Sequence, residues 1–232
     1  MAAGFLMNDL LDRQIDRAAG RPLHVESLGL RSAAVITALL FLLAVAAGFA
    51  VSAAFGLLIL LNAAALLFYN LFTKRIFWLK PFLASALIVT IYPMAYLATP
   101  WAADGPRKWT LHVHAAWLFL MAVSYEIFHD AADLAADRSL GVRTIPTQLG
   151  LGAANRIAGA SLFLACLISF VPCLAGWSGG FYLVFVLLQC AISLFFLRTD
   201  APARYRAVLT AIAAIIAGSF LDLMAGTSQW HY

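Results

Sequence analysis

The chain has 232 residues, of which 64% are hydrophobic and only 11% are charged, and its formal net charge is +4. A soluble domain carries roughly a quarter charged residues, so this composition excludes an ordinary soluble protein. A positive net charge permits a nucleic-acid partner, but the placement of the basic residues, described below, argues against one.

The chain begins with a short apolar segment, residues 1–7, followed by the acidic sequence NDLLDRQID. Asp9, Asp12 and Asp16 repeat there at i, i+3 and i+7, positions that share about a 60° arc of a helix. Residues 1–7 supply less than half of the roughly 20 residues that a membrane span requires. We therefore expect the natural reading frame to extend upstream by about 40–60 residues. The alternative is a short segment lying at the cytoplasmic interface.

Seven apolar runs follow, each close to the 17–25 residues that cross a bilayer as a helix. They show no strand-like alternation, which favours helices over a barrel. We expect an all-α, polytopic transmembrane bundle of seven full spans preceded by a partial N-terminal helix. The predicted spans are residues 33–51, 54–72, 82–98, 111–128, 157–175, 180–197 and 207–225.

The basic residues lie almost entirely in alternate loops. Thirteen of the fifteen Lys and Arg residues precede the first span or lie between spans two and three, four and five, or six and seven. These loops open on one side, and basic loops stay in the cytoplasm. We expect this side to be cytoplasmic and the C-terminus external, in a membrane of the bacterial inner type. The other side carries only Arg107 and Lys108.

A second acidic segment, HDAADLAAD, leaves the fourth span on the cytoplasmic side with the same spacing, at Asp130, Asp133 and Asp137. Like charges on one helix face repel each other unless a cation lies between them. The C-terminal end of a helix also disfavours negative charge. Magnesium typically binds one or two carboxylates, water and substrate phosphate oxygens. The two segments together predict a magnesium-bridged diphosphate at the membrane surface.

The ordered motifs resemble the UbiA superfamily of intramembrane prenyltransferases. NDLLDRQID, followed by RPL at 21–23, is similar to the first aspartate motif of that family. Tyr69 with Lys74 and Arg75 resembles its short basic loop. The second motif and the loop after it are matched at Glu126, Ile127, Asp130, Asp133, Asp137, Arg138, Gly141, Thr144, Pro146 and Gly150.

The resemblance implies a nine-span fold around a cavity open to lipid, with residues 1–232 forming one transmembrane domain that lacks the first helix and part of the second. It implies Mg²⁺-dependent transfer from an isoprenyl diphosphate to an aromatic or other lipophilic acceptor, in isoprenoid or quinone biosynthesis, with membrane lipid and no nucleic acid as partners. The implied metal ligands are Asp9, Asp12, Asp16, Asp130, Asp133 and Asp137, with Asp9, Asp12, Asp130 and Asp133 catalytic. Substrate contacts are expected from Asn8, Tyr69, Lys74, Arg75, Tyr125 and Arg138.

Two features bear on the acceptor. Ala136 stands where glycine is common in the family, and Tyr125 stands where many members have arginine. The second motif resembles branches acting on homogentisate, chlorophyll precursors or geranylgeranylglyceryl phosphate more than the 4-hydroxybenzoate branch. The base that removes the acceptor proton is not identified, although His129 adjoins the second segment.

Three other functions stay open from the sequence. Intramembrane acids often line the ion path of a coupled transporter, but such coupling sites usually lie near the midplane, and these carboxylates lie at helix ends. An alcohol phosphatidyltransferase would compress its aspartates into one stretch, which neither segment does. A catalytically inactive member of the family would retain the fold without the reaction.

Overall fold

The computed structural model describes residues 2–18, 24–73, 76–99 and 106–225. Every regular element in these ranges is a helix, so the all-α prediction is confirmed. The helices are α1 (Ala2–Ala18), α2 (His24–Leu28), α3 (Leu30–Val51), α4 (Ala53–Phe72), α5 (Leu79–Val89), α6 (Ile91–Ala98), α7 (Pro106–Ala132), α8 (Leu134–Ser139), α9 (Ile145–Ser169), α10 (Val171–Leu174), α11 (Gly180–Phe196) and α12 (Ala201–Met224).

Six helical stretches among the described residues are long and apolar enough to cross a membrane. They overlap six of the seven predicted spans. The remaining predicted span, 180–197, corresponds to the helix Gly180–Phe195, which is apolar but shorter than the others. The six are Leu30–Val51, Ala53–Phe72, Leu79–Ala98, Trp109–Ala132, Ile145–Leu174 and Pro202–Met224.

Two of the spans are interrupted next to a proline. The proline ring clashes with the carbonyl of the residue four positions earlier and removes one helical hydrogen bond. Pro93 lies four residues after Val89, where α5 ends, and Pro172 lies three residues after Ser169, where α9 ends. Each span is therefore made of a longer helix followed by a shorter one.

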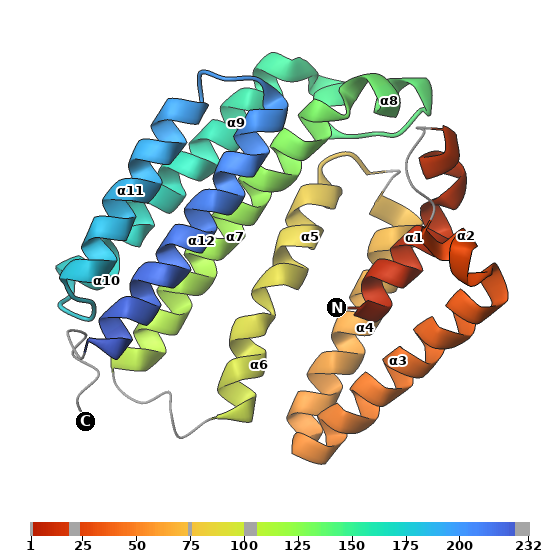
Figure 1. Cartoon of the computed structure of the whole chain (residues 1–232), viewed down its shortest axis with the longest axis horizontal. Helices are drawn as coiled ribbons and strands as arrows, with labels where there is room; N and C mark the ends of the chain where they lie inside the picture. The colour runs from red at the N-terminus through yellow and green to blue at the C-terminus, as the bar shows by residue number, and fades with distance from the viewer. Residues whose placement is uncertain (1, 19–23, 74–75, 100–105, 226–232) are drawn as a thin grey trace.

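The helices form two packed groups joined by α5 and α6 (Figure 1). In one group α7 packs against α9 and α12, and α11 packs against α12; in the other α1, α3 and α4 pack together. The main buried core lies in the first group, where Trp117, Met121, Phe128 and Ile215 are almost completely inaccessible to solvent. Many large apolar side chains of α3, α4 and α11 point outward, as expected for surfaces that face lipid.

One end of the bundle gathers the chain segments that carry the acidic motifs. The C-terminal ends of α1 and α7, the whole of α8 and the start of α5 lie at the top of Figure 1. The C-terminal ends of α4 and α11 lie at this end too. The predicted grouping of the basic loops on one side therefore agrees with the fold, and α12 runs away from this end toward the other.

Candidate functional site

The first acidic segment lies on one continuous helix. Asp9, Asp12 and Asp16 all belong to α1 and are partly buried, as is Asn8. Their spacing therefore places the three carboxylates along one face, as predicted. The end of α1 is tied to α2 by an ion pair between Arg17 and Glu26.

The second acidic segment is not one helix, and that part of the prediction is wrong. Helix α7 ends at Ala132, Asp133 has φ −90° and ψ 5°, and Asp137 lies on α8. The backbone N–H groups of Asp133 and Asp137 still donate to carbonyls four residues earlier, at 3.1 and 2.9 Å. Aspartate competes well for backbone groups outside regular helix, which suits it to this turn. Asp137 is therefore carried on a separate short helix, where its Oδ2 accepts from Thr144 Oγ1 at 3.5 Å.

Asp130 is the most deeply buried carboxylate of the two segments, with 1% of its surface exposed. Its Oδ1 accepts a hydrogen bond from Nζ of Lys80, at the start of α5, and the two form an ion pair. Its Oδ2 is also buried and has no hydrogen-bond partner among the described residues. A buried carboxylate oxygen without a donor is costly, so a further cation or donor at this atom would be favourable.

Two more polar groups adjoin this ion pair. Tyr69, in the last turn of α4, and Glu126, one helical turn before Asp130, lie close enough to Lys80 to interact electrostatically. The Lys80 ammonium group is therefore directly paired with Asp130 and also feels the charges of Glu126 and Tyr69, at the junction of α4, α5 and α7. Sequence reasoning singled out Tyr69 but not Lys80.

His129 lies in a cluster of aromatic rings. Its Nδ1 is 3.7 Å from Oδ2 of Asp133, and its ring centroid is 5.9 Å from that of Tyr125 and 5.3 Å from that of Tyr205. The two tyrosine rings meet edge to face at 5.9 Å. Tyr205 comes from α12 and was missed by sequence reasoning; its position between two arginines at the start of the last span was the available signal.

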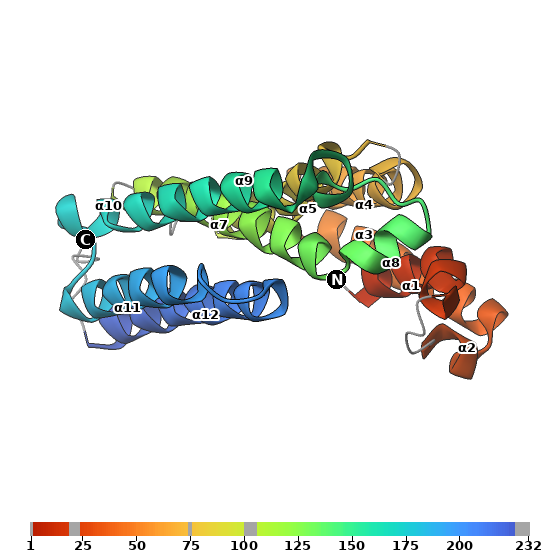
Figure 2. The same ribbon diagram turned by 90° about the horizontal axis from the view of Figure 1, so that it is seen from above.

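The structure gives less information on the remaining predicted residues. Arg138 is exposed on α8. Lys74 and Arg75 lie outside the described residues. The end of α1 lies beside α8 in both views (Figures 1 and 2), so the two acidic segments share one end of the bundle.

The donor chemistry fits magnesium. All six candidate ligands are aspartates, and the unpartnered Oδ2 of Asp130 is an acceptor that a cation would satisfy. Within the described residues no three acidic, histidine or cysteine side chains converge closely enough to hold an ion by themselves. Magnesium usually takes only one or two carboxylates together with water and phosphate oxygens, so this spacing is compatible with an ion completed by a diphosphate.

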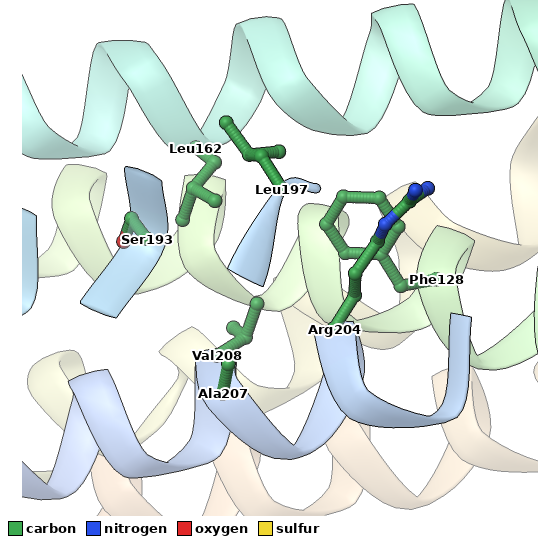
Figure 3. Close-up of a pocket in the computed structure, with 7 residues that line it drawn as sticks. All are labelled: Phe128, Leu162, Ser193, Leu197, Arg204, Ala207 and Val208. Atoms are coloured by element: carbon green, nitrogen blue, oxygen red, sulfur yellow. The ribbon is translucent and has the colours of Figure 1, made fainter. Parts of the chain in front are cut away.

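Two pockets elsewhere do not contain the predicted residues. The smaller, about 10 Å³, has room for roughly one water molecule and lies between Phe128, Leu162 and Arg204 (Figure 3). Arg204 there donates to Asn155 Oδ1 at 2.7 Å and stacks 5.7 Å from the centre of the Phe128 ring, so it ties α12 to α9 and α7. The larger, about 240 Å³, is lined by His114 and Asp222 on α7 and α12, near the opposite end of the bundle.

Comparison with known proteins agrees with this architecture. Residues 1–216 match the profile of the UbiA prenyltransferase family. A digeranylgeranylglyceryl phosphate synthase of Haloquadratum walsbyi is 29% identical over 187 residues, which cover 80% of this chain and 64% of that protein. The synthase of Thermococcus gammatolerans is 31% identical over 236 residues, covering 97% of this chain and 81% of that protein. The chain thus spans just under two thirds of the length of the first of these relatives.

A solved structure has the same fold. The apo structure of a UbiA homolog from Aeropyrum pernix K1 superposes with a TM-score of 0.78 at 23% identity, covering 95% of this chain and 84% of that one. At this identity the likeness concerns the fold alone. The helical membrane architecture predicted from the sequence is therefore confirmed.

Proposed function

The chain belongs to the UbiA prenyltransferase family, and we propose that it transfers an isoprenyl group from an isoprenyl diphosphate to a lipophilic acceptor within the membrane. The observation that carries the proposal is the position of the two aspartate segments. They lie on α1 and at the junction of α7 and α8, at one end of an apolar bundle (Figure 1). A charged donor headgroup would bind at this end, with its isoprenyl chain among the apolar helices.

Magnesium bound by the aspartates would neutralise the diphosphate and make it a better leaving group. The proposed ligands are Asp9, Asp12, Asp16, Asp130, Asp133 and Asp137. Lys74, Arg75 and Arg138 would add charge-assisted hydrogen bonds to the phosphate oxygens, and Asn8 and Tyr69 would orient the headgroup. We expect this site to face the cytoplasm, because it lies on the side that carries most of the basic residues.

The reaction breaks the bond between the allylic carbon of the donor and the diphosphate oxygen, and the electron pair leaves with the diphosphate. A nucleophilic atom of the acceptor then bonds to that carbon and loses its proton to a base. Tyr125 and Tyr205 would present aromatic faces to the cation-like carbon and keep water from it. His129 is the candidate base closest to them, with Asp133 3.7 Å away to stabilise its protonated form.

The relatives narrow the choice of acceptor. The two relatives described above are named digeranylgeranylglyceryl phosphate synthases and come from archaea. They lend no support to quinone biosynthesis or to a bacterial inner membrane, both of which the sequence had suggested. We therefore propose geranylgeranylglyceryl phosphate as the first acceptor to test, with homogentisate and 4-hydroxybenzoate as competing acceptors.

The test is a transfer assay in membranes that contain the protein. Radiolabelled geranyl, farnesyl and geranylgeranyl diphosphates are each incubated with the three acceptors. We expect a labelled lipophilic product that disappears with a chelator and returns when Mg²⁺ is restored. Failure of every donor and acceptor pair to yield product, with the protein present and folded in the membrane, would contradict the proposal.

A further inference from the structure

The ion pair between Lys80 and Asp130 joins two helices far apart in the sequence. Lys80 lies in the first turn of α5 and Asp130 in the last turn of α7. Only 21% of the Lys80 side chain and 2% of the Asp130 side chain are exposed. The pair therefore sits in surroundings where water screens charge poorly, and each partner depends on the other.

Two further ionisable groups act on this pair. Glu126 on α7 and Tyr69 on α4 interact electrostatically with the Lys80 ammonium group, in addition to its direct ion pair with Asp130. Asp133, by contrast, is 31% exposed and lies where α7 gives way to α8. The second segment thus has a buried inner carboxylate that is ion-paired with Lys80 and a partly exposed outer carboxylate near His129.

We propose that Lys80 is the resident counter-cation of Asp130, and that it restrains metal binding at the second aspartate segment until a diphosphate arrives to share the ammonium group. The inference rests on the proposed function, because it takes this segment as a metal site. A cation bound at Oδ2 of Asp130 would gain an oxygen that lacks a partner among the described residues, but the nearby ammonium would repel it and so weaken this gain. The substrate-free protein should therefore bind a divalent ion mainly through the outer carboxylates.

The chemistry of lysine suits such a role. Its ammonium group has three N–H donors, of which Asp130 Oδ1 receives one. Its flexible four-carbon stem lets the charge move. A diphosphate oxygen could attract the ammonium by a charge-assisted hydrogen bond and lower the repulsion felt by a metal at Asp130. Metal and diphosphate would then favour each other's binding, which makes Lys80 a positioning residue for the metal–diphosphate complex.

The experiment measures Mn²⁺ binding to the purified protein in lipid nanodiscs, by electron paramagnetic resonance and without substrate. In Lys80→Met the positive charge is lost while the stem remains, and we expect Mn²⁺ to bind about tenfold more tightly. Lys80→Arg, which keeps the charge, should behave like the wild type. Arg198→Met removes an exposed positive charge from the loop after α11, at the same end of the bundle, and should change the affinity less than twofold.

A double mutant locates the effect. Adding Asp130→Asn to Lys80→Met should remove the gain in Mn²⁺ affinity. Arg198→Met should show no gain, so it gives the double mutant nothing to remove. If Lys80→Met does not fold, Lys80→Gln replaces it, because the amide can still donate to Asp130 without carrying charge. Unchanged Mn²⁺ affinity in a folded, uncharged Lys80 variant would overturn the inference alone. Absence of Mn²⁺ binding from every variant and the wild type would overturn the metal site of the proposed function as well.

Discussion

At the scale of single residues, aspartates of the same proposed role occupy different surroundings. Asp12 is partly buried on α1, Asp133 lies at a helix junction beside His129, and Asp130 is buried against Lys80. A buried carboxylate that loses its partner is expensive, whereas a partly exposed one is not. Substitution of these residues should therefore separate effects on catalysis from effects on folding.

We expect Asp12→Asn and Asp133→Asn to lower kcat about a thousandfold, because each removes a negative charge that would hold the metal. Their thermal stability should stay close to that of the wild type. Asp130→Asn should lose activity to a similar degree but should also unfold more easily, since it removes the carboxylate that is directly ion-paired with the largely buried Lys80. Transfer assays and thermal unfolding in detergent measure both effects. Near-normal activity in all three variants would contradict the metal–diphosphate site.

Tyr205 offers a second test, of the aromatic cluster. Tyr205→Leu should lower kcat roughly tenfold and raise the share of prenyl alcohol, because the loss of a ring weakens cation stabilisation and admits water. Tyr205→Phe retains the ring and should keep most of the activity. Tyr96→Leu, at an exposed tyrosine of α6, is the matched control. The two products are separated by chromatography, and an unchanged ratio in Tyr205→Leu would argue against a role for this ring.

The aspartates could be found from the sequence because their spacing repeats and because charge is rare in this chain. Tyr69 and Tyr125 could be found because they border charged segments. The pairing of Lys80 with Asp130 could not, since the two residues lie 50 positions apart and meet only when α5 packs against α7. Tyr205 also borders charged residues, but its place beside Tyr125 and His129 depends on tertiary packing, which brings α12 to α7.

At the scale of helices, apolar runs predict which part of a helix spans the hydrocarbon better than they predict where the helix begins and ends. The fifth span was expected at 157–175, but α9 begins at Ile145. Its start is fixed by a capping box, in which the Thr144 side chain accepts from the backbone of Thr147 and the Thr147 side chain accepts in return. Hydropathy is blind to such polar contacts, so it missed this first helical turn, which the non-helical backbone of Gly150 (φ 80°, ψ 162°) separates from the rest of α9.

A close approach between α11 and α12 makes a prediction at this scale. A Cβ atom at Gly218 would lie 2.7 Å from Cβ of Phe185, too close unless a helix shifts. We expect Gly218→Val to destabilise the protein by about 1–3 kcal/mol, through overpacking. Ala217→Val, at the neighbouring exposed position, should have little effect. Thermal unfolding of the two variants in the same detergent decides the matter, and equal stability would show that the helices can separate at low cost.

At the scale of the whole molecule, two separate patterns in the sequence agree with the fold. The apolar runs predicted the six helical stretches that are long enough to cross a membrane, together with the shorter one at Gly180–Phe195, and the basic residues predicted which ends lie together. Both patterns depend on the transfer of whole segments into lipid. An error in one predicted helix boundary therefore does not change either prediction. The arrangement of helices into two groups joined by α5 and α6 depends on side-chain packing, which composition does not encode.

The orientation of the bundle follows from the same charges. Thirteen of the fifteen basic residues lie in the sequence segments predicted to be on the side that carries both aspartate segments. Basic segments near spans resist translocation, so this side should stay in the cytoplasm. Helix α12 runs from that end to the opposite one, where Ala225 ends the described part of the chain (Figure 1). A tail following α12 should therefore emerge on the external side.

We predict that alkaline phosphatase fused after Tyr232 is active, because the enzyme folds only outside the cytoplasm, whereas green fluorescent protein at the same place stays dark. A cysteine introduced as Ser139→Cys, on exposed α8, should react with an impermeant maleimide only in inverted vesicles. Cys166, Cys173 and Cys190 lie within apolar helices, so a variant with all three changed to alanine supplies the background. Labelling of Ser139→Cys in intact cells, together with a fluorescent fusion, would reverse the orientation. The charge distribution would then have failed as a guide, and the donor would have to reach the aspartates from outside.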